Sequence, residues 1–415
     1  MSKPRSYLLM REEAYDSKIL KRNVTDRKDI VKKVFVLGSY GCGNRGDDAI
    51  LQSIAEAFAQ RNVRIYATCG KFENISKWLP VRAVPCRLNE GFSIPVLISM
   101  CRSGIVMTFR ILQSDMLIYG GGSLIHDLTA YNLPFMFLWH TVAKIFGKKI
   151  VYLGMGIGPI KTDRGKKLCK KYLPQADGLF VRDQRGYDIC KDLGLENVRM
   201  MKDLVFLLEE KNQCSSNPLQ AMGLIKGEYV CVTASQWFDS SNFWDRNSLD
   251  FQAQIENFTS CVRTFLEKTG KKAVFVPTVF HDLDIGMNLL SALGTDKIKI
   301  VPTKYNSREM AEIIENCYCL LGVRMHSMIF AVKQGVPVLP LVYDEKVSQL
   351  LHLMELDRYA IALSVVTPEK VAEITDEILE NYSSISELLK KKAAQFGAEN
   401  RQIINQVLTS LIGEN

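Results

Sequence analysis

The 415-residue sequence lacks an uninterrupted apolar run of the roughly 18–20 residues that a membrane-spanning helix needs. Residues 92–112 come nearest, but Arg102 and Arg110 interrupt them, and residues 133–149 end in a glycine and two lysines. We interpret both stretches as buried or half-buried helices, with contact to a bilayer surface as the alternative. Residues 1–29 hold no apolar segment of the signal-peptide type, so we expect a cytoplasmic protein, either free or peripheral on the cytoplasmic face of the inner membrane.

The cysteines lack the spacing of a metal site or of a disulfide framework. The eleven cysteines contain no CxxC pair, so we expect reduced thiols. Cys317 and Cys319 lie in an apolar, strand-like run, and no cysteine or histidine follows at zinc-ligand spacing. We therefore expect core positions for both and no metal.

Extremes of composition are absent as well. An apolar fraction of 47% and a charged fraction of 24% are ordinary for a globular protein and exclude disordered and fibrous classes. The net charge of +8 fits an anionic small substrate or an anionic membrane surface. No RNA- or DNA-binding motif is present, so we expect no nucleic-acid partner.

Strands alternate with helices along the chain, and several strands run into glycine-rich turns. This order predicts parallel, doubly wound α/β domains, and the length favours two of them. The expected parts are a charged leader at 1–30, an N-terminal Rossmann-like domain at 31–208, a linker at 209–228, a C-terminal Rossmann-like domain at 229–367 and C-terminal helices at 368–415. Two such domains predict a GT-B-like fold in which ligands bind where the carboxyl ends of the strands face each other across a cleft.

Two glycine-rich turns are candidates for ligand contact. In the first, residues 38–51, glycines allow close backbone approach, yet the pattern is neither GxGxxG nor a Walker A loop. Asp47 is its better site candidate, whereas Asp48 is as readily a first-turn helix carboxylate. The second turn, residues 119–127, has three consecutive glycines, with Ser123 as an expected helix N-cap.

Cations follow three predicted strands of the chain. Arg182 ends one strand, with a surface ion pair to Asp183 as its alternative explanation. Arg324 and His326 follow another strand, and in extended geometry they would share the face over the cleft. Lys346 comes just after the next strand. We expect the three cations to converge on an anionic ligand beside an imidazole.

Five stretches occur in an order that resembles the polysaccharide pyruvyl transferase family. They are "GNRGDDAIL", "GGGSLIHD", "GIGPI", "VRD" and "GVRMHSMIFAVKQGVPVLPLVYDEKV", and the resemblance covers about residue 34 to residue 347. Members of that family resemble GT-B folds and transfer a pyruvyl group from phosphoenolpyruvate to a sugar of a cell-surface polysaccharide. Met325 replaces the family's commoner leucine, an exchange of similar volume, and Asp48 stands where glutamate is frequent.

The resemblance implies roles for individual residues. His326 would act as general acid or base, and Asp47 is the second catalytic candidate. Whether His326, Asp47 or Asp127 protonates the methylene carbon stays open. The expected phosphoenolpyruvate-binding residues are Arg182, Arg324, Lys346 and Ser327. The expected acceptor-side residues are Asn44, Gly46, Gly121, Gly122, Ser123 and Asp127. The acceptor would be a sugar hydroxyl pair, on an undecaprenyl-diphosphate-linked oligosaccharide. Ketal formation needs an acid and a base but no cofactor.

Two other functions fit parts of this pattern. A GT-B glycosyltransferase that uses nucleotide sugars would share the fold, but Glu345 is only a loose match to its ribose-binding glutamate. A non-catalytic binding protein would keep the scaffold alone, and the retained cations and His326 argue against it.

Overall fold

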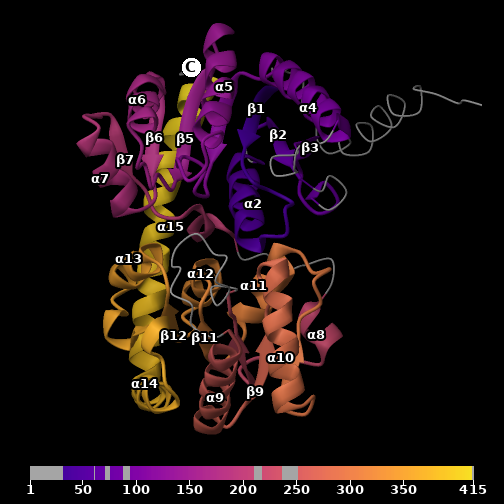
Figure 1. The fold of residues 1–415 in the computed structure, drawn as a ribbon, viewed down its shortest axis with the longest axis vertical. Helices are drawn as coiled ribbons and strands as arrows, with labels where there is room; N and C mark the ends of the chain where they lie inside the picture. The colour runs from indigo at the N-terminus through magenta and orange to yellow at the C-terminus, as the bar shows by residue number, and fades with distance from the viewer. Residues whose placement is uncertain are drawn as a thin grey trace, which may run out of the picture. The chain divides into compact units, whose positions relative to one another are not determined.

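The computed structural model describes residues 31–59, 61–70, 75–86, 94–209, 217–235 and 251–413. The leader predicted for residues 1–30 and the part of the predicted linker at 210–216 lie outside these ranges. Two parallel sheets, each covered by helices, form the remainder (Figure 1). The predicted fold class of two Rossmann-like domains is therefore confirmed. Among the described residues, no helix is long and apolar enough to cross a membrane.

The first sheet has seven parallel strands in the order β3-β2-β1-β4-β5-β6-β7. The strands are β1 (Lys32–Leu37), β2 (Val63–Cys69), β3 (Arg82–Pro85), β4 (Met116–Gly120), β5 (Lys149–Met155), β6 (Gly178–Val181) and β7 (Val198–Met200). The helices of this domain are α2 (Arg45–Ala59), α4 (Ile94–Gln113), α5 (Asn132–Ile145), α6 (Asp163–Tyr172) and α7 (Gln184–Asp192), with the 3₁₀ helix η1 (Leu173–Gln175).

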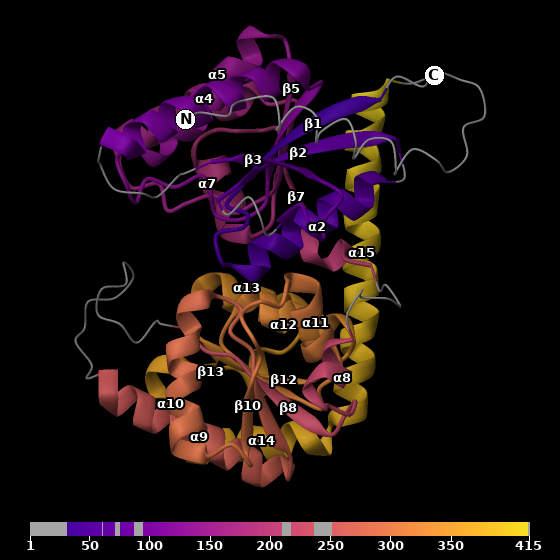
Figure 2. The ribbon, with the colours of Figure 1, turned by 90° about the vertical axis from the view of Figure 1, so that its right-hand side faces the viewer.

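Strand β1 shows why this sheet is covered on both faces. Val34 and Val36 belong to one apolar cluster, which includes α2, whereas Phe35 and Leu37 belong to a second cluster with α4 and α5. All four side chains are fully buried. Alternate residues of a strand point to opposite faces, so an uninterrupted apolar run needs cover on each. Figure 2 shows α4 and α5 together on one side and α2 on the other.

The second sheet has six strands in the order β10-β9-β8-β11-β12-β13. They are β8 (Tyr229–Val232), β9 (Lys272–Phe275), β10 (Ile298–Ile300), β11 (Leu320–Gly322), β12 (Val338–Val342) and β13 (Ile361–Ala362). The helices are α8 (Pro218–Met222), α9 (Phe251–Thr269), α10 (Leu283–Leu293), α11 (Ser307–Glu315), α12 (Met325–Lys333), α13 (Glu345–Met354), α14 (Pro368–Glu380) and α15 (Tyr382–Ile412). Four 3₁₀ helices, η2 (Leu204–Leu207), η4 (Phe280–Asp282), η5 (Asp357–Tyr359) and η6 (Leu363–Val365), complete the described elements.

The long helix α15 contacts both domains. It packs on α12 of the second domain and on η2, which follows the first sheet. The buried Asn400 side chain donates to the carbonyl of Asp203 at 3.0 Å and accepts from the amide of Lys202 at 2.9 Å. One apolar cluster also runs from the α2 face through η2 into the second domain. The two domains are therefore held by a shared core as well as by polar contacts.

The first glycine turn makes main-chain contact with the second domain. The amide of Arg45 donates to the carbonyl of Thr278 at 2.8 Å, and the amide of Phe280 donates to the carbonyl of Gly43 at 3.1 Å. Gly43 has a φ of +86°, and a Cβ added there would come within 2.8 Å of the Phe280 ring. A Cβ at Gly46 would lie 2.0 Å from the Nδ1 of His326. Glycine is thus required at both positions for the two domains to meet.

Gly43→Ala should lower the free energy of unfolding more than Gly194→Ala does. Both glycines have positive φ, but a Cβ at Gly194 would meet nothing within 4 Å. We expect a loss of about 1 kcal/mol for Gly194→Ala from backbone strain alone. Gly43→Ala should lose roughly 1–3 kcal/mol more because the methyl group strikes Phe280. Urea unfolding of both variants measures the difference, and equal losses would show that the approach to Phe280 is not tight.

Candidate active site

A cavity of 270 Å³ lies between the two domains, where the carboxyl ends of their strands meet. Among the residues expected from the sequence to form the site, those that line it are Asn44, Gly46, Asp47, Gly121, Gly122, Ser123, Arg182, Arg324, His326 and Lys346. Tyr40, Thr278, Val279, Met325 and Tyr343 add to the wall. Residues from distant parts of the sequence thus meet in one cavity.

Two of the expected site residues do not line this cavity. The Ser327 side chain is fully buried at the start of α12, where its hydroxyl donates to the Arg324 carbonyl at 2.6 Å and contacts the Thr233 hydroxyl at 2.9 Å. The Asp127 carboxylate accepts from the amides of Lys161 and Thr162 at 2.8 and 2.6 Å. Despite some desolvation, these amides hold the pKa of Asp127 below its usual value. Both side chains have structural contacts here, which corrects their predicted places in the site.

Ser123 lines the cavity. The sequence predicted that it would cap a helix, and this prediction is wrong. The next helix, α5, begins only at Asn132. The Ser123 hydroxyl instead accepts a hydrogen bond from Nη2 of Arg182 at 3.2 Å. Gly121 and Gly122, just before it, have φ values of +68° and +71°. These left-handed conformations turn the main chain along the cavity wall without side chains in the way.

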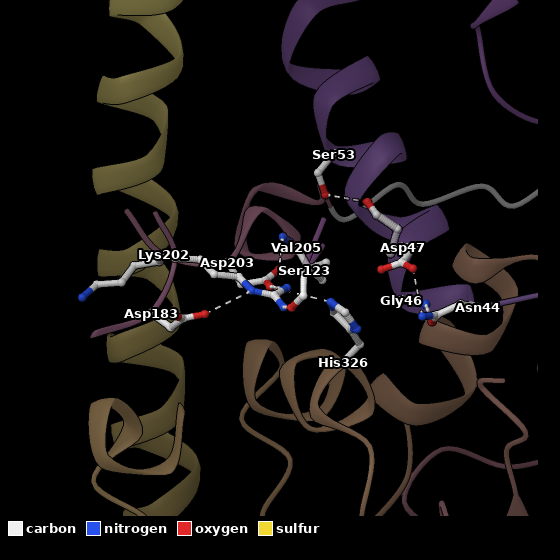
Figure 3. Close-up of polar contacts among 12 residues, drawn as sticks. Asn44, Gly46, Asp47, Ser53, Ser123, Asp183, Lys202, Asp203, Val205 and His326 are labelled. Carbon is white, nitrogen blue, oxygen red and sulfur yellow. Dashed lines mark hydrogen bonds and ion pairs between the residues drawn. The ribbon is translucent and has the colours of Figure 1, made fainter. Parts of the chain in front are cut away.

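Asp203 connects two of the predicted site residues. Its Oδ2 lies 3.0 Å from Nη1 of Arg182 and 3.7 Å from Nε2 of His326. One buried carboxylate therefore contacts a guanidinium of the first domain and faces the imidazole of the second domain (Figure 3). Its Oδ1 accepts from the amide of Val205 at 3.0 Å, and α15 fixes its main chain through Asn400. Sequence reasoning missed Asp203 because it follows no strand-end glycine turn; it caps the short 3₁₀ helix η2 instead.

The contact between Asp203 and Arg182 keeps both side chains charged. Burial raises the pKa of a carboxyl group, but pairing with His326 and Arg182 overrides that effect and holds the pKa of Asp203 well below its usual range. Burial would lower the pKa of Arg182, and the surrounding carboxylates of Asp203, Asp183 and Asp47 raise it instead. The predicted Arg182–Asp183 ion pair is present at 3.7 Å, although the contact with Asp203 is shorter.

Arg324 is anchored by a second buried carboxylate that sequence reasoning missed. Nε of Arg324 donates to Oδ2 of Asp282 at 3.0 Å and to the carbonyl of Ala234 at 3.2 Å, and Nη2 forms an ion pair with Oδ1 of the same aspartate. This pairing raises the pKa of Arg324 against the effect of burial. Arg324 is also the N-cap residue of α12, and His326 lies in the first turn. The extended geometry predicted for residues 324–326 is therefore wrong, because helix begins at Met325.

Asp47 contributes a carboxyl group to the cavity wall, and the cavity alters its pKa. It is half-buried, and its Oδ2 accepts from Nδ2 of Asn44 at 3.0 Å. Burial raises its pKa above the ordinary 3.8, although His326 and Arg182 partly offset that shift. A carboxyl group of this kind holds its proton closer to neutral pH than an exposed one does, so Asp47 is suited to deliver a proton.

Asp48, its neighbour, has a structural role. The fully buried carboxylate accepts from the amide of Gly41 at 2.7 Å and from Nη1 of Arg45 at 3.1 Å. Burial raises the pKa of Asp48 to about 6, against the opposing effect of both contacts. Asp48 thus holds the first glycine turn in place from within α2 and does not line the cavity.

Lys346 is the most accessible of the three cavity cations. It lies in the first turn of α13, its side chain is 33% exposed, and its Nζ is 3.3 Å from Oδ2 of Asp344. It also borders a second pocket of 190 Å³, which shares Ser123 with the main cavity and includes His126 and Gln349. Among the described residues, no group of three or more histidine, cysteine or acidic side chains could hold a metal ion.

Comparisons with known proteins agree with this fold and this order of motifs. The polysaccharide pyruvyl transferase family matches residues 44–345. The amylovoran biosynthesis protein AmsJ of Erwinia amylovora is 20% identical over 91% of this chain and 100% of its own length.

Solved structures show the same architecture. A putative UDP-N-acetylglucosamine 2-epimerase from Listeria monocytogenes has a TM-score of 0.61 and 13% identity, covering 92% of this chain and 97% of that one. The S. aureus MnaA–UDP co-structure has a TM-score of 0.60, with the same identity and coverage. At such identities these structures report on the GT-B-like fold alone. The family match, however, covers most of the chain, which therefore belongs to the polysaccharide pyruvyl transferase family.

Proposed function

We propose that this protein transfers the pyruvyl group of phosphoenolpyruvate onto two hydroxyls of one sugar in a cell-surface polysaccharide precursor, with release of phosphate. The observation that carries the proposal is the single cavity in which Asp47, His326 and three cations meet. Family membership and the similarity to an amylovoran biosynthesis protein support pyruvyl transfer in polysaccharide synthesis.

Phosphoenolpyruvate carries a carboxylate and a phosphate, and both need fixed positive partners. Arg182 and Arg324 are each held by a buried aspartate, so their orientation is set before any ligand binds. Lys346 has the more exposed head group and would contact the phosphate. The N-terminus of α12 adds main-chain amides with the favourable end of the helix dipole beside the same cavity. We propose that the donor lies among these groups.

The chemistry requires one proton to reach carbon and others to leave oxygen. Asp47, with its raised pKa, would protonate the methylene carbon, which becomes the methyl group. A sugar hydroxyl attacks the adjacent carbon and passes its proton to His326. The bond from that carbon to the phosphate oxygen then breaks, and the phosphate leaves with the proton that His326 returns. The second hydroxyl attacks the same carbon, passes its proton to the Asp47 carboxylate and closes the ketal. Asp203 would act as a positioning residue that orients the imidazole.

The acceptor would enter through the 190 Å³ pocket, which adjoins the main cavity at Ser123 and Lys346. Its wall includes His126, Asp183 and Gln349, polar groups that suit sugar hydroxyls. We propose an acceptor linked to an undecaprenyl-diphosphate carrier and a cytoplasmic enzyme that works at the inner-membrane surface. No cofactor is required for the proposed steps.

His326→Ala should reduce turnover by about 10²–10⁴-fold, the usual contribution of a general acid or base, without loss of folding. Phosphate release from phosphoenolpyruvate with a panel of lipid-linked glycan intermediates measures it. His352→Ala is the matched control, because that imidazole is 82% exposed and outside the cavity. Full turnover by His326→Ala would contradict the assigned role. Product formation from UDP-sugars, with phosphoenolpyruvate inert, would instead identify a glycosyltransferase.

Asp47→Asn should abolish most turnover and yet raise the free energy of unfolding at neutral pH. A carboxyl group with a raised folded-state pKa stabilises the fold fully below its unfolded pKa of about 3.8. That contribution is lost as the pH rises through the folded-state pKa, where the partly desolvated group must ionise. Denaturant unfolding of wild type and variant, from below the unfolded-state pKa to above the folded-state pKa, measures this effect. The variant should lack the Asp47 contribution to the pH dependence of the free energy of unfolding.

Asp127→Asn is the matched control, because the pKa of Asp127 is lowered where that of Asp47 is raised. Its folded-state pKa is lowered, so its contribution is present above the unfolded pKa and is lost as the pH falls through the folded-state pKa. We expect this variant to be less stable than wild type at neutral pH. An Asp47→Asn protein that also lost stability would contradict the assignment of Asp47 as an acid with a raised pKa.

A further inference from the structure

A patch of exposed apolar side chains covers the outer side of α4 and α5. Eleven large apolar side chains are exposed among the described residues, and seven of them belong to this patch. They are Ile105, Val106, Phe109, Tyr131, Leu138, Ile145 and Phe146, which we call the α4–α5 face. Ile105 is 71% exposed and Ile145 is 72% exposed. An apolar concentration of this kind on one surface indicates a binding partner.

The side chains of the face are aligned along two neighbouring helices. Tyr131, Leu138 and Ile145 are seven residues apart and so lie on one side of α5. Ile105 and Phe109 are four apart on α4. The two helices pack against each other and run side by side in Figure 2. Their inward sides bury other apolar residues in the core of the sheet, so the exposed stripe is surplus to folding.

Helix α6 places a basic surface beside this apolar face. It packs against α5, and five of its side chains are exposed cations with one acidic residue among them. The cations are Arg164, Lys166, Lys167, Lys170 and Lys171. Lys144 and Lys149, at the end of α5 and in the following strand, are also exposed. An apolar face flanked by lysines complements the acyl boundary and the negative head groups of an anionic bilayer.

We infer that the α4–α5 face docks on an anionic phospholipid bilayer, with its apolar side chains at the acyl boundary and the α6 cations on lipid phosphates. A second copy of the chain is a poorer occupant, because a self-complementary contact would bring two basic α6 surfaces towards each other. The inference depends on this surface alone and holds whether or not the proposed reaction is correct.

The face begins next to the wall of the cavity. The Nδ2 of Asn132, the first residue of α5, donates to the carbonyls of Leu124 and His126 at 2.8 and 2.9 Å. Leu124 lines the main cavity and His126 the adjoining pocket, while Tyr131 of the face directly precedes α5. If the proposed function is right, a lipid-linked acceptor in the same bilayer would therefore approach the second glycine turn.

The test is flotation of the full chain with vesicles of phosphatidylglycerol and phosphatidylcholine, compared with pure phosphatidylcholine. Phe109→Ser/Ile145→Ser removes apolar contacts of the face. Its matched control is Met287→Ser/Ile225→Ser in the other domain. Met287 and Ile225 are 52% and 71% exposed, close to the 54% of Phe109 and the 72% of Ile145. Lys166→Gln/Lys167→Gln/Lys170→Gln is matched in charge by Lys226→Gln/Lys297→Gln/Lys304→Gln, three exposed lysines elsewhere.

We expect wild type and both controls to float with anionic vesicles only, and each α4–α5 or α6 variant to bind at least roughly tenfold more weakly. Phosphate release with a water-soluble acceptor, measured in parallel, should be unchanged by every variant, which separates this inference from the proposed reaction. Undiminished flotation of Phe109→Ser/Ile145→Ser would overturn the inference. A wild-type dimer that this variant converts to a monomer, without vesicle binding, would overturn it in favour of a second copy.

Discussion

The close approach of the first glycine turn to the second domain is the constraint on which the site depends. Main-chain hydrogen bonds join Gly43 and Arg45 to residues 278–280, and Gly46 lies against the imidazole of His326. Side chains at either glycine would hold the domains apart. Since Asp47 follows directly, this approach places a carboxyl group of one domain and an imidazole of the other in the same 270 Å³ cavity. The glycines of this turn are therefore needed first for domain contact and only then for ligand access.

Charge within the cavity is balanced before a substrate binds. Asp203 pairs with Arg182, Asp282 with Arg324, and Asp344 with Lys346, so each cation has a carboxylate partner. The sequence predicted the convergence of these three cations but, apart from the alternative pairing of Arg182 with Asp183, none of their carboxylate partners. Buried pairs fix the guanidinium groups in place, which reduces the reorganisation needed when an anion arrives. The same pairs lower the net positive potential of the cavity. The more exposed Lys346 and the N-terminus of α12 would therefore contribute more of the attraction for a polyanionic donor.

Sequence reasoning predicted the fold and much of the cavity because both follow from strand periodicity and strand-end position. Arg182, Arg324 and Lys346 do follow strands of parallel sheets, as their positions in the sequence predicted. Asp203 and Asp282 escaped prediction because each lies in or beside a 3₁₀ helix, and its partner is distant in sequence. Ser327 was misplaced for a local reason, since an early helix start at Met325 turns its hydroxyl inward. Such contacts depend on tertiary structure rather than local pattern.

The α4–α5 face and the cavity are connected through one sheet. Helices of parallel α/β units return from the carboxyl edge of the sheet, so each begins near the ligand side and ends away from it. Helix α5 follows the second glycine turn and carries Tyr131 at its start and Ile145 at its end. A surface that lies along α5 must therefore pass close to the cavity wall at the Tyr131 end. The topology that brings the strand-end residues together thus also sets the distance between the cavity and any bilayer that covers this face.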